Sequence, residues 1–420
     1  MNSYVLAGGI FVITYIIIIS ERIHRTLAAL LGGMLMILLG IVTQEDAFLS
    51  IDLNVIFLLA GMMMIAHVMG ETGIFQWLAV QAVRIGRGEP VRILLIISAI
   101  TATASALLDN VTVIVLIAPV ILYVARTLDV NPIPFLIAGV MASNIGGAAT
   151  LIGDPPNILI GSAADIDFLK FLINMGPPAF FALIGGLLVS VFQFNRQLHV
   201  PVDRRKAVMR LTTKGLINDG VMLSKSLIVL AIVLLGFFLQ GWLNLEPATI
   251  ALSGATLLLI WTRYEPAKVL ENIEWTTLMF FVGLFITVQA IVEVGIIAEI
   301  ADTLIFLTAG NLNITAYFLL WFSALASGVV DNIPYTATMI PVVEGLKGIL
   351  PLEPLWWALA LGADFGGNLT LVGASANVVV ASLSERSGHR LGFIEFLRYG
   401  TIYVAVTLLI ATAWLSWRYF

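Results

Sequence analysis

Apolar stretches of nearly membrane-spanning length follow one another along almost the whole chain, with only short polar segments between them. Examples are residues 10–19, 27–42, 226–239 and 401–414. A helix of about 20 apolar residues crosses the hydrocarbon core of a bilayer, so each stretch accounts for most of a crossing. Few of the stretches carry the polar face that a surface helix of a soluble protein shows. The pattern predicts an all-α, polytopic membrane protein.

The residues that punctuate these stretches recur in the second half of the chain, first at a shift of 222 residues and then, after a two-residue slip, at a shift of 220. The first register pairs Gly61 with Gly283, Glu71 with Glu293, Gly73 with Gly295, Ser105 with Ser327, Asp109-Asn110 with Asp331-Asn332 and Pro119 with Pro341. The second register pairs Gly146-Gly147 with Gly366-Gly367, Thr150 with Thr370, Gly153 with Gly373 and Asn157 with Asn377. Because these residue types have particular backbone or polar roles, their agreement predicts an internal duplication.

The duplication divides the chain into two repeats joined by a basic linker, 196–225. The first repeat, 1–195, contains spans near 4–19, 27–42, 54–70 and 173–194, a short interfacial helix near 74–84, a hairpin over 91–126 and an interrupted helix over 132–164. The second repeat, 226–420, has its hairpin over 313–346 and its interrupted helix over 354–383.

The broken element 91–126 either crosses the bilayer twice or enters it as a re-entrant hairpin, and the basic residues favour the hairpin. With a hairpin, each repeat crosses five times and the second repeat is inverted. All but three of the 21 Lys and Arg residues then lie on one side, the exceptions being Lys170, Lys347 and Arg418. Since Lys and Arg accumulate in cytoplasmic loops, we expect ten spans in the inner (plasma) membrane, a cytoplasmic central loop and both termini outside.

Composition narrows the class of function. Of the 420 residues, 60% are hydrophobic and 11% are charged, which is far less charge than a soluble domain carries. The absence of cysteine excludes disulfides and thiolate metal sites. No Walker A, HExxH or Gly-x-Ser-x-Gly motif occurs, so we expect no ATP site, no cofactor, no metal and no enzymatic activity. The basic linker is typical of a topology anchor, and we expect no nucleic-acid partner.

Four carboxylates lie in the breaks of otherwise apolar elements: Asp109, Asp154, Asp331 and Asp364. A charged group in hydrocarbon is costly, so an intramembrane carboxylate indicates a functional site by default. Matched breaks in two repeats are typical of a transporter's binding site, because irregular backbone at membrane depth must be buried or line a cavity. We therefore assign proton or ion coupling to these four aspartates.

Each hairpin tip carries the same pair of residues, Asp109-Asn110 in the first repeat and Asp331-Asn332 in the second. The carboxylate can cap the following helix by accepting hydrogen bonds from its free N–H groups. The remaining oxygens, the two amides and Thr112 can also face a cavity and bind an ion or the hydroxyl groups of a substrate. The cap and the binding role are compatible, and both stay open at this point.

The interrupted helices break over residues 143–157 and 364–377. Glycines in these breaks allow the backbone to approach a ligand, and Pro155-Pro156 excludes an unbroken helix. A half-helix that restarts near residue 157 directs its positive dipole end at the site. The candidate substrate-binding residues here are Asn144, Gly146, Gly147, Thr150, Asn157, Asn368, Thr370 and Asn377. Asn144 matches Asp364, and Asp154 matches Ala374, so each break keeps one carboxylate at a different place.

These motifs resemble the ion transporter superfamily, and within it the branch of arsenite efflux permeases, NhaD sodium/proton antiporters and the melanosomal P protein. The most specific stretch is SNIGGAATLIGDPPN, residues 143–157. The resemblance implies a scaffold domain, a transport domain that carries both hairpins, and elevator-like alternating access. It also implies that the hairpin tips and the two interrupted helices form the site.

One departure from the wider superfamily bears on the substrate. Its dicarboxylate carriers are known for neutral Ser-Asn-Thr hairpin tips, whereas Asp109 and Asp331 stand first in the tips of this chain. Two carboxylates repel a dianion, so a neutral polyhydroxylated substrate or a cation fits better. We expect export of arsenite, as As(OH)₃, and of antimonite, in exchange for protons. Sodium/proton antiport is the alternative, and transport of an anion is a third.

The partners expected are a small inorganic substrate, a coupling proton or Na⁺, and the lipid bilayer. A homodimer and a cytoplasmic ATPase partner stay open. An intramembrane enzyme would need a nucleophile and base or a set of metal ligands, which the sequence does not offer.

Overall fold

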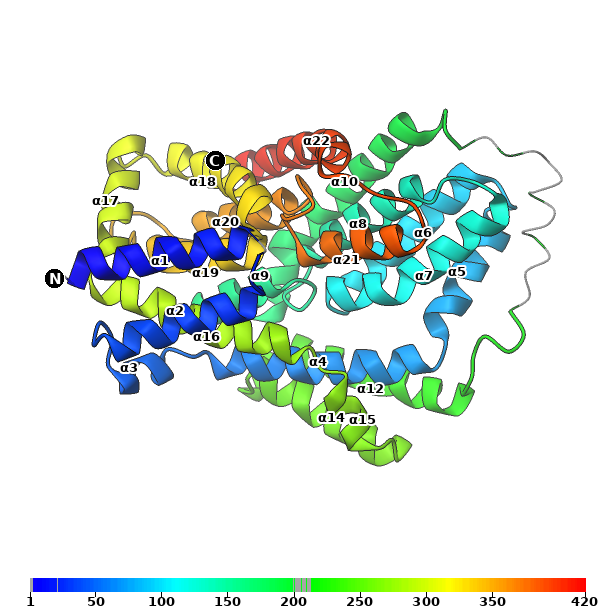
Figure 1. The fold of residues 1–420 in the computed structure, drawn as a ribbon, viewed down its shortest axis with the longest axis horizontal. Helices are drawn as coiled ribbons and strands as arrows, with labels where there is room; N and C mark the ends of the chain where they lie inside the picture. Colours follow the sequence, from blue (N-terminus) through cyan, green and yellow to red (C-terminus); the bar gives the residue numbers. More distant parts are fainter. Residues whose placement is uncertain (1–2, 21, 199, 201–204, 206–208, 210–212) are drawn as a thin grey trace.

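The computed structural model describes residues 3–20, 22–198, 200, 205, 209 and 213–420, and within these residues it contains helices and connecting segments but no strand (Figure 1). The first repeat contains α1 (Ser3–Ser20), α2 (Arg25–Leu38), α3 (Gln44–Leu49), α4 (Leu53–Glu71), α5 (Ile74–Ile85), α6 (Pro90–Ser105), α7 (Asn110–Leu128), α8 (Ile133–Gly147), α9 (Pro155–Ala163) and α10 (Phe168–Phe194). The second contains α12 (Gly220–Phe238), α13 (Gln240–Leu243), α14 (Pro247–Thr262), α15 (Pro266–Glu271), α16 (Trp275–Glu293), α17 (Ile296–Thr308), α18 (Leu312–Val330), α19 (Asn332–Glu344), α20 (Glu353–Gly366), α21 (Ser375–Arg386) and α22 (Phe393–Tyr419).

Eight helical segments of the described chain are long and apolar enough to cross a membrane, namely α1, α3–α4, α7, α10, α12, α16, α18 and α22. The prediction of an all-helical polytopic membrane protein is therefore confirmed. The set differs from the expected ten spans. Helices α2 and α14 have 14 and 16 residues and fall below spanning length, whereas α7 and α18, which were expected as hairpin arms, reach it. The number of crossings stays a prediction.

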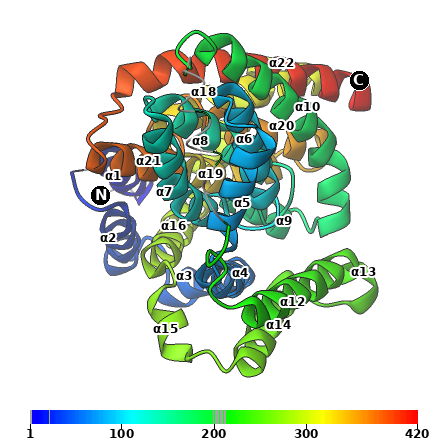
Figure 2. The same cartoon turned by 90° about the vertical axis from the view of Figure 1, so that its right-hand side faces the viewer.

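The helices pack in two groups. In the first group, α2 packs on α1 and α16, and α4 packs on α12 and α14. In the second group, the hairpin arms α6 and α18 pack on the interrupted-helix segments α8 and α20, and α10 packs on α22. Both ribbon views place α22 on one side of the molecule and α12 and α14 on the opposite side (Figures 1 and 2). We call the first group the scaffold group. The second group, together with α7, α9, α19 and α21, which pack on α8 and α20, is the hairpin group.

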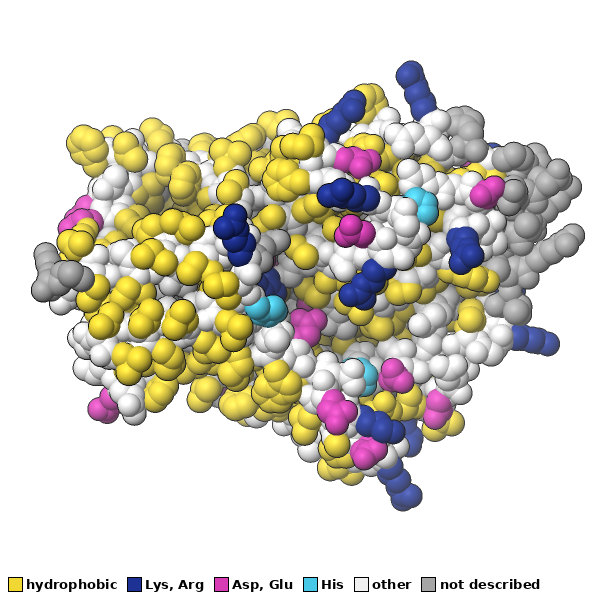
Figure 3. Space-filling view, viewed as in Figure 1, with side chains coloured by type: hydrophobic (Ala, Val, Ile, Leu, Met, Phe, Trp, Pro, Cys, Tyr) yellow, Lys and Arg dark blue, Asp and Glu magenta, His cyan; other side chains and the backbone are white. Residues whose placement is uncertain are grey.

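The surface supports contact with lipid. On the face drawn in Figure 3, hydrophobic side chains cover the half that holds α1, α2 and α16, and most charged side chains gather on the other half. Large apolar residues such as Leu31 and Ile16 are exposed there, which costs little in a bilayer and much in water.

The two hairpins approach each other from opposite ends of the molecule. Helices α6 and α7 lie toward one end and α18 and α19 toward the other, so the tips meet near the middle (Figure 1). Glycines allow each hairpin to lie close to its interrupted helix. A Cβ added at Gly146 would collide with the carbonyl of Ala102 in α6, and one added at Gly366 would collide with Ala324 in α18. The matched glycines therefore permit matched close contacts.

The predicted basic linker, 196–225, lies partly outside the described residues, which omit 199, 201–204, 206–208 and 210–212. Its last part contacts the scaffold group. The backbone N–H of Asn218 donates to the Thr72 carbonyl at 2.9 Å, and the Asn218 amide donates to the Glu71 carbonyl at 3.3 Å. These bonds satisfy carbonyls at the end of α4.

Candidate functional site

Six helices begin around one point between the two groups, and this gives the site its electrostatic character. They are α2, α7, α9, α16, α19 and α21. Residues at or just before their starts line two adjoining cavities. The start of a helix presents free N–H groups and the positive end of its dipole. Four of the residues that precede these starts are acidic: Asp109, Asp154, Glu274 and Asp331. The converging helix starts stabilise three buried carboxylates, those of Asp109, Asp154 and Asp331, and the half-buried carboxylate of Glu274.

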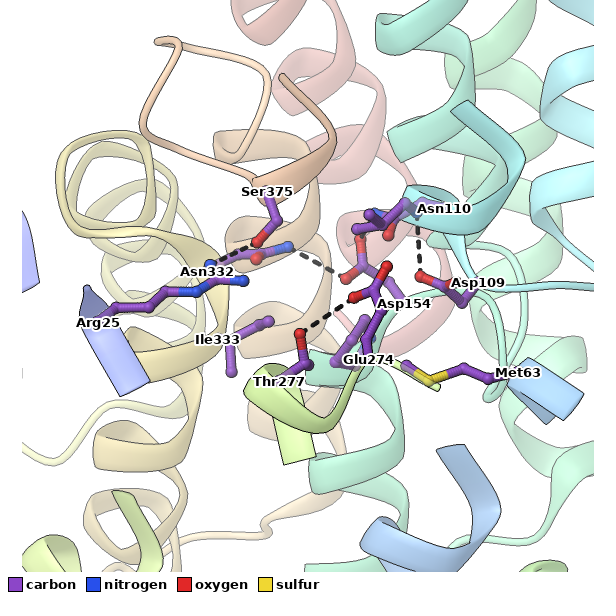
Figure 4. Close-up of a pocket in the computed structure, with 12 residues that line it drawn as sticks. Arg25, Met63, Asp109, Asn110, Asp154, Glu274, Thr277, Asn332, Ile333 and Ser375 are labelled. Carbon is purple, nitrogen blue, oxygen red and sulfur yellow. Dashed lines mark hydrogen bonds between the residues drawn. The ribbon is translucent and has the colours of Figure 1, made fainter. Parts of the chain in front are cut away.

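The first hairpin tip is held by its own aspartate. The two carboxylate oxygens of Asp109 accept the backbone N–H groups of Val111 and Thr112, each at 3.0 Å. Thr112 thus takes part through its backbone as a partner of the cap. The capping role considered from the sequence is present, and Asp109 still lines the cavity (Figure 4).

The second hairpin tip has the same cap and an additional partner. One oxygen of Asp331 accepts the Ile333 N–H at 3.0 Å. The other accepts hydrogen bonds from Arg25 Nη1 at 2.9 Å and from Ser375 Oγ at 3.3 Å. Asp331 has φ +85°, a strained conformation for a residue with a side chain, and such strain is common at functional sites. The two tips therefore share a sequence but not an environment.

Asp154 lies between the tips and receives an amide from each of them. Asn110 Nδ2 donates to Asp154 Oδ2 at 2.6 Å, and Asn332 Nδ2 donates to Asp154 Oδ1 at 3.3 Å. Figure 4 shows both amides directed at this carboxylate. Asp154 is 1% exposed, so it depends on these donors. One residue of an interrupted helix thus links both hairpins.

Each interrupted helix has one asparagine, Asn157 or its match Asn377, whose side chain bonds across the break. Asn157 donates its amide hydrogens to the carbonyls of Gly147 and Thr150, at 3.2 and 3.1 Å. Asn377 makes the equivalent bonds, to the carbonyls of Gly367 and Thr370, at 2.7 and 2.8 Å. Both amide hydrogens are used in this way. The amide oxygen of each asparagine is therefore directed toward the interrupted helix of the other repeat: Asn157 toward α20 and Asn377 toward α8.

The two amide oxygens meet different partners. Asn377 Oδ1 accepts Nδ2 of Asn144 at 3.0 Å, and the same nitrogen donates to Asn368 Oδ1 at 2.9 Å. On the other side, Asp364 stands at the position that matches Asn144, with Asn157 beside it. Neither oxygen of Asp364, nor the amide oxygen of Asn157, has a donor among the described residues. All three atoms are buried acceptors.

Two cavities meet at the site. The smaller, about 10 Å³, is lined by residues that include Asp109, Asn110, Asp154 and Asn332. The larger, about 330 Å³, extends past Asp331. Four polar residues that line both cavities were not expected from the sequence: Arg25, Glu274, Thr277 and Ser375. The 222-residue register offered a signal for Glu274, because it matches Asp52 and each residue precedes a long apolar helix. The register offered no signal for Arg25, because it matches Pro247.

Of the residues predicted for the site, Asp109, Asn110, Asp154, Asp331 and Asn332 line these cavities, and the others, Asp364 and Asn157 included, lie behind them. Thr150 Oγ1 donates to the Ala106 carbonyl, and Thr370 Oγ1 donates to the Gly328 carbonyl, both at 2.6 Å. These hydroxyls tie each interrupted helix to its hairpin. Gly146 and Gly147 serve close packing in the same region. Among the residues that the structure describes, no group of three His, Asp or Glu side chains could hold a metal ion.

The family model described as citrate transporter matches residues 15–362, most of the chain. The chain belongs to the citrate transporter family. An uncharacterized transporter of Mycobacterium tuberculosis is 43% identical over 424 residues and aligns with 99% of each chain. The human P protein is 33% identical over 98% of this chain and 59% of its own length. The solved YdaH transporter of Alcanivorax borkumensis has a TM-score of 0.61 at 15% identity, covering 99% and 98% of the two chains.

These relatives confirm the resemblance to the ion transporter superfamily, including the P protein named within its branch. This member of the citrate transporter family is a membrane transporter and not an enzyme. The likeness to YdaH is at the level of the fold.

Proposed function

We propose that this protein is a proton-coupled secondary transporter that exports arsenite, with Asp364 carrying the coupling proton. The observation that carries the proposal is the pair formed by Asp364 and Asn157. Both present only acceptor oxygens to each other when Asp364 is ionised, and both are fully buried. A buried acceptor without a donor costs about 1–3 kcal/mol, so this arrangement calls for a proton or a cation between the two side chains.

The opposite repeat supports the proton. There, Asn144 supplies an N–H to Asn377. A protonated Asp364 would supply an O–H to Asn157 in the matching place, and the two halves of the site would then be equivalent in hydrogen bonding. Loss of that proton leaves the second half without its donor. The protonated and ionised states of Asp364 would therefore differ in the hydrogen bonding, and so in the stability, of the hairpin group.

The substrate proposed follows from the acceptors at the site. The amide oxygen of Asn110 is also buried, and no residue in the described part of the chain donates to it. Arsenite near neutral pH is mainly As(OH)₃, whose three hydroxyls can donate to such oxygens. A cavity of about 10 Å³ holds roughly one water molecule, so the site must widen to admit As(OH)₃. Antimonite has the same chemistry and is proposed with it.

Sodium/proton antiport is the second candidate, and the same atoms favour it. Na⁺ is a hard cation that prefers carboxylate and amide oxygens, and the small cavity suits an ion of its size. An anion is less suited, because Arg25 is the only Lys or Arg among the residues that line the two cavities, and it is already paired with Asp331.

Movement of the hairpin group against the scaffold group would expose the site alternately to each side, as the resemblance implies. The sidedness proposed is a cytoplasmic linker with both termini outside. A homodimer and an ATPase partner stay predictions of the sequence.

The decisive experiment is transport in proteoliposomes under an imposed pH gradient. Arsenite movement that dissipates the gradient would support the first candidate, and a response to Na⁺ with none to arsenite would leave only the second. Asp109→Asn and Asp331→Asn should each reduce transport while the folded protein is retained. The conservative surface change Arg22→Gln, at an exposed residue, serves as the control. Unchanged activity in both aspartate variants would disprove the site assignment.

A further inference from the structure

Arg25 makes the two hairpin tips unequal. Its guanidinium contacts the carboxylate of Asp331 at 2.9 Å and the hydroxyl of Ser375 at 2.6 Å. The first tip has the same Asp-Asn pair but no arginine, because the residue that matches Arg25 is Pro247. Asp109 instead lines the smaller cavity together with the carboxylate of Glu274.

Arg25 belongs to the scaffold group and reaches across to the hairpin group. The helix start that carries it is tied to α16 by the Thr26 hydroxyl, which donates to the Thr276 carbonyl at 2.7 Å. The guanidinium also lies 5.4 Å from the centre of the Phe280 ring, a cation–π distance. Its partners, Asp331 and Ser375, lie at the starts of α19 and α21, and Figure 4 shows Arg25 directed at Ser375. The arginine is therefore held by one group while it neutralises a carboxylate of the other.

The pair is partly shielded from water, which strengthens the attraction between its two charges. The side chains of Arg25 and Asp331 are 28% and 9% exposed. A charge pair in such a place is screened far less than one at a free surface. Any cation that bound to Asp331 would have to displace the guanidinium first.

We propose that Arg25 is the charge-selecting residue of the second hairpin tip: it occupies Asp331 and thereby excludes cations from that tip, leaving the first tip and the central carboxylates as the places where a cation or proton binds. This inference rests on the proposed function only in taking the hairpin tips as the cargo site. Two tips of different charge let one transporter bind a neutral group at the second tip and exchange a cation or proton at the first tip and the central carboxylates.

The test measures Na⁺ binding without transport, through the melting temperature of the purified protein in NaCl against choline chloride at equal ionic strength. In Arg25→Gln, half-maximal stabilisation should need about tenfold less Na⁺ than in the wild type, because a shielded carboxylate is set free. Arg25→Lys should behave as the wild type, since it keeps the charge. The exposed neighbour Arg22→Gln should also leave the Na⁺ response unchanged.

The gain must depend on Asp331, so Arg25→Gln combined with Asp331→Asn should return the Na⁺ requirement to the wild-type value or above it. If Arg25→Gln does not fold, Arg25→Met keeps an apolar stem against Phe280 and replaces it in the comparison. A folded neutral variant with the wild-type Na⁺ curve would overturn the inference. Failure of the wild type to move arsenite or Na⁺ would count against the proposed function alone, because melting requires no transport.

Discussion

If Asp364 carries the coupling proton, its replacement by asparagine should separate proton coupling from the binding of substrate. Asn144 already shows that an amide fits the matching position, where it donates to Asn377 at 3.0 Å. The amide of Asp364→Asn can donate to the buried oxygen of Asn157, which has no donor among the described residues. One hydrogen bond is worth about 0.5–1.5 kcal/mol net. The free energy of unfolding of the variant should therefore equal that of the wild type with Asp364 protonated, and it should exceed that of the wild type with Asp364 ionised by about 1 kcal/mol.

The variant cannot release a proton, so two assays should diverge. Net transport driven by a pH gradient should fall to background, because each cycle requires a proton to leave the site. Exchange of labelled for unlabelled substrate across the same vesicles requires no net proton movement and should persist. Gradient-driven transport at the wild-type rate would refute the role of Asp364. Loss of both activities in a folded variant would mean that Asp364 binds substrate or supports the structure.

The reverse substitution provides the matched control. Asn144→Asp removes the donor that now serves both Asn368 and Asn377. When ionised, the new carboxylate would leave two buried acceptors unpaired, at about 1–3 kcal/mol each, so this variant should be destabilised by about 2–6 kcal/mol. The double variant, Asn144→Asp with Asp364→Asn, moves the carboxyl of this matched pair from position 364 in the second repeat to position 144 in the first. If coupling depends on that one carboxyl, gradient-driven transport should partly return in the double variant.

Two further predictions concern the packing and the movement of the hairpin group. Gly146→Ala places a Cβ on the backbone of α6 and should lower stability by more than about 2 kcal/mol, measured as a fall in melting temperature; a fully stable variant would contradict the close packing. Because the chain has no cysteine, introduced pairs can be cross-linked selectively. Asp52 and Ser162 contact each other at 2.5 Å between the groups, and Asn54 and Glu246 contact at 3.1 Å within the scaffold group. Bridging cysteines at the first pair with a short dithiol-specific reagent should stop transport, whereas bridging the second should not; equal effects would argue against relative movement.

The breaks in the helices could be predicted because their causes are local. Pro155 suits the first turn of α9, and Asp109 and Asp331 supply the acceptors that a new helix start needs. The repeat register added the correspondence between Asn144 and Asp364, one of the chemical differences between the two halves. Helix lengths were predicted less well, since α2 ends at Leu38, where the apolar run extended to residue 42.

Partners across the two groups could not be predicted. Arg25 looked like one more basic residue at the end of a span, and its contact with Asp331 joins positions 306 residues apart. Glu274 has no local pattern that distinguishes it from any acidic residue before a helix. Its place in the cavity depends on how α16 packs against the hairpin group, and no sequence period encodes that packing.

The sequence by itself determined that the chain is a membrane protein made of two related halves whose polar residues gather at helix breaks. The lengths of the apolar stretches, the helix-breaking residues and the repeat register can be read from the chain alone. They are reliable because an unsatisfied backbone polar group costs several kcal/mol in the bilayer core. Only the tertiary structure decided which polar groups are satisfied and which are not. Among the residues that it describes, it shows no donor to the carboxylate oxygens of Asp364 or the amide oxygen of Asn157, and it pairs Arg25 with Asp331 of the second tip. Hydrogen bonding inside a membrane protein depends on neighbours that the chain brings together from a distance.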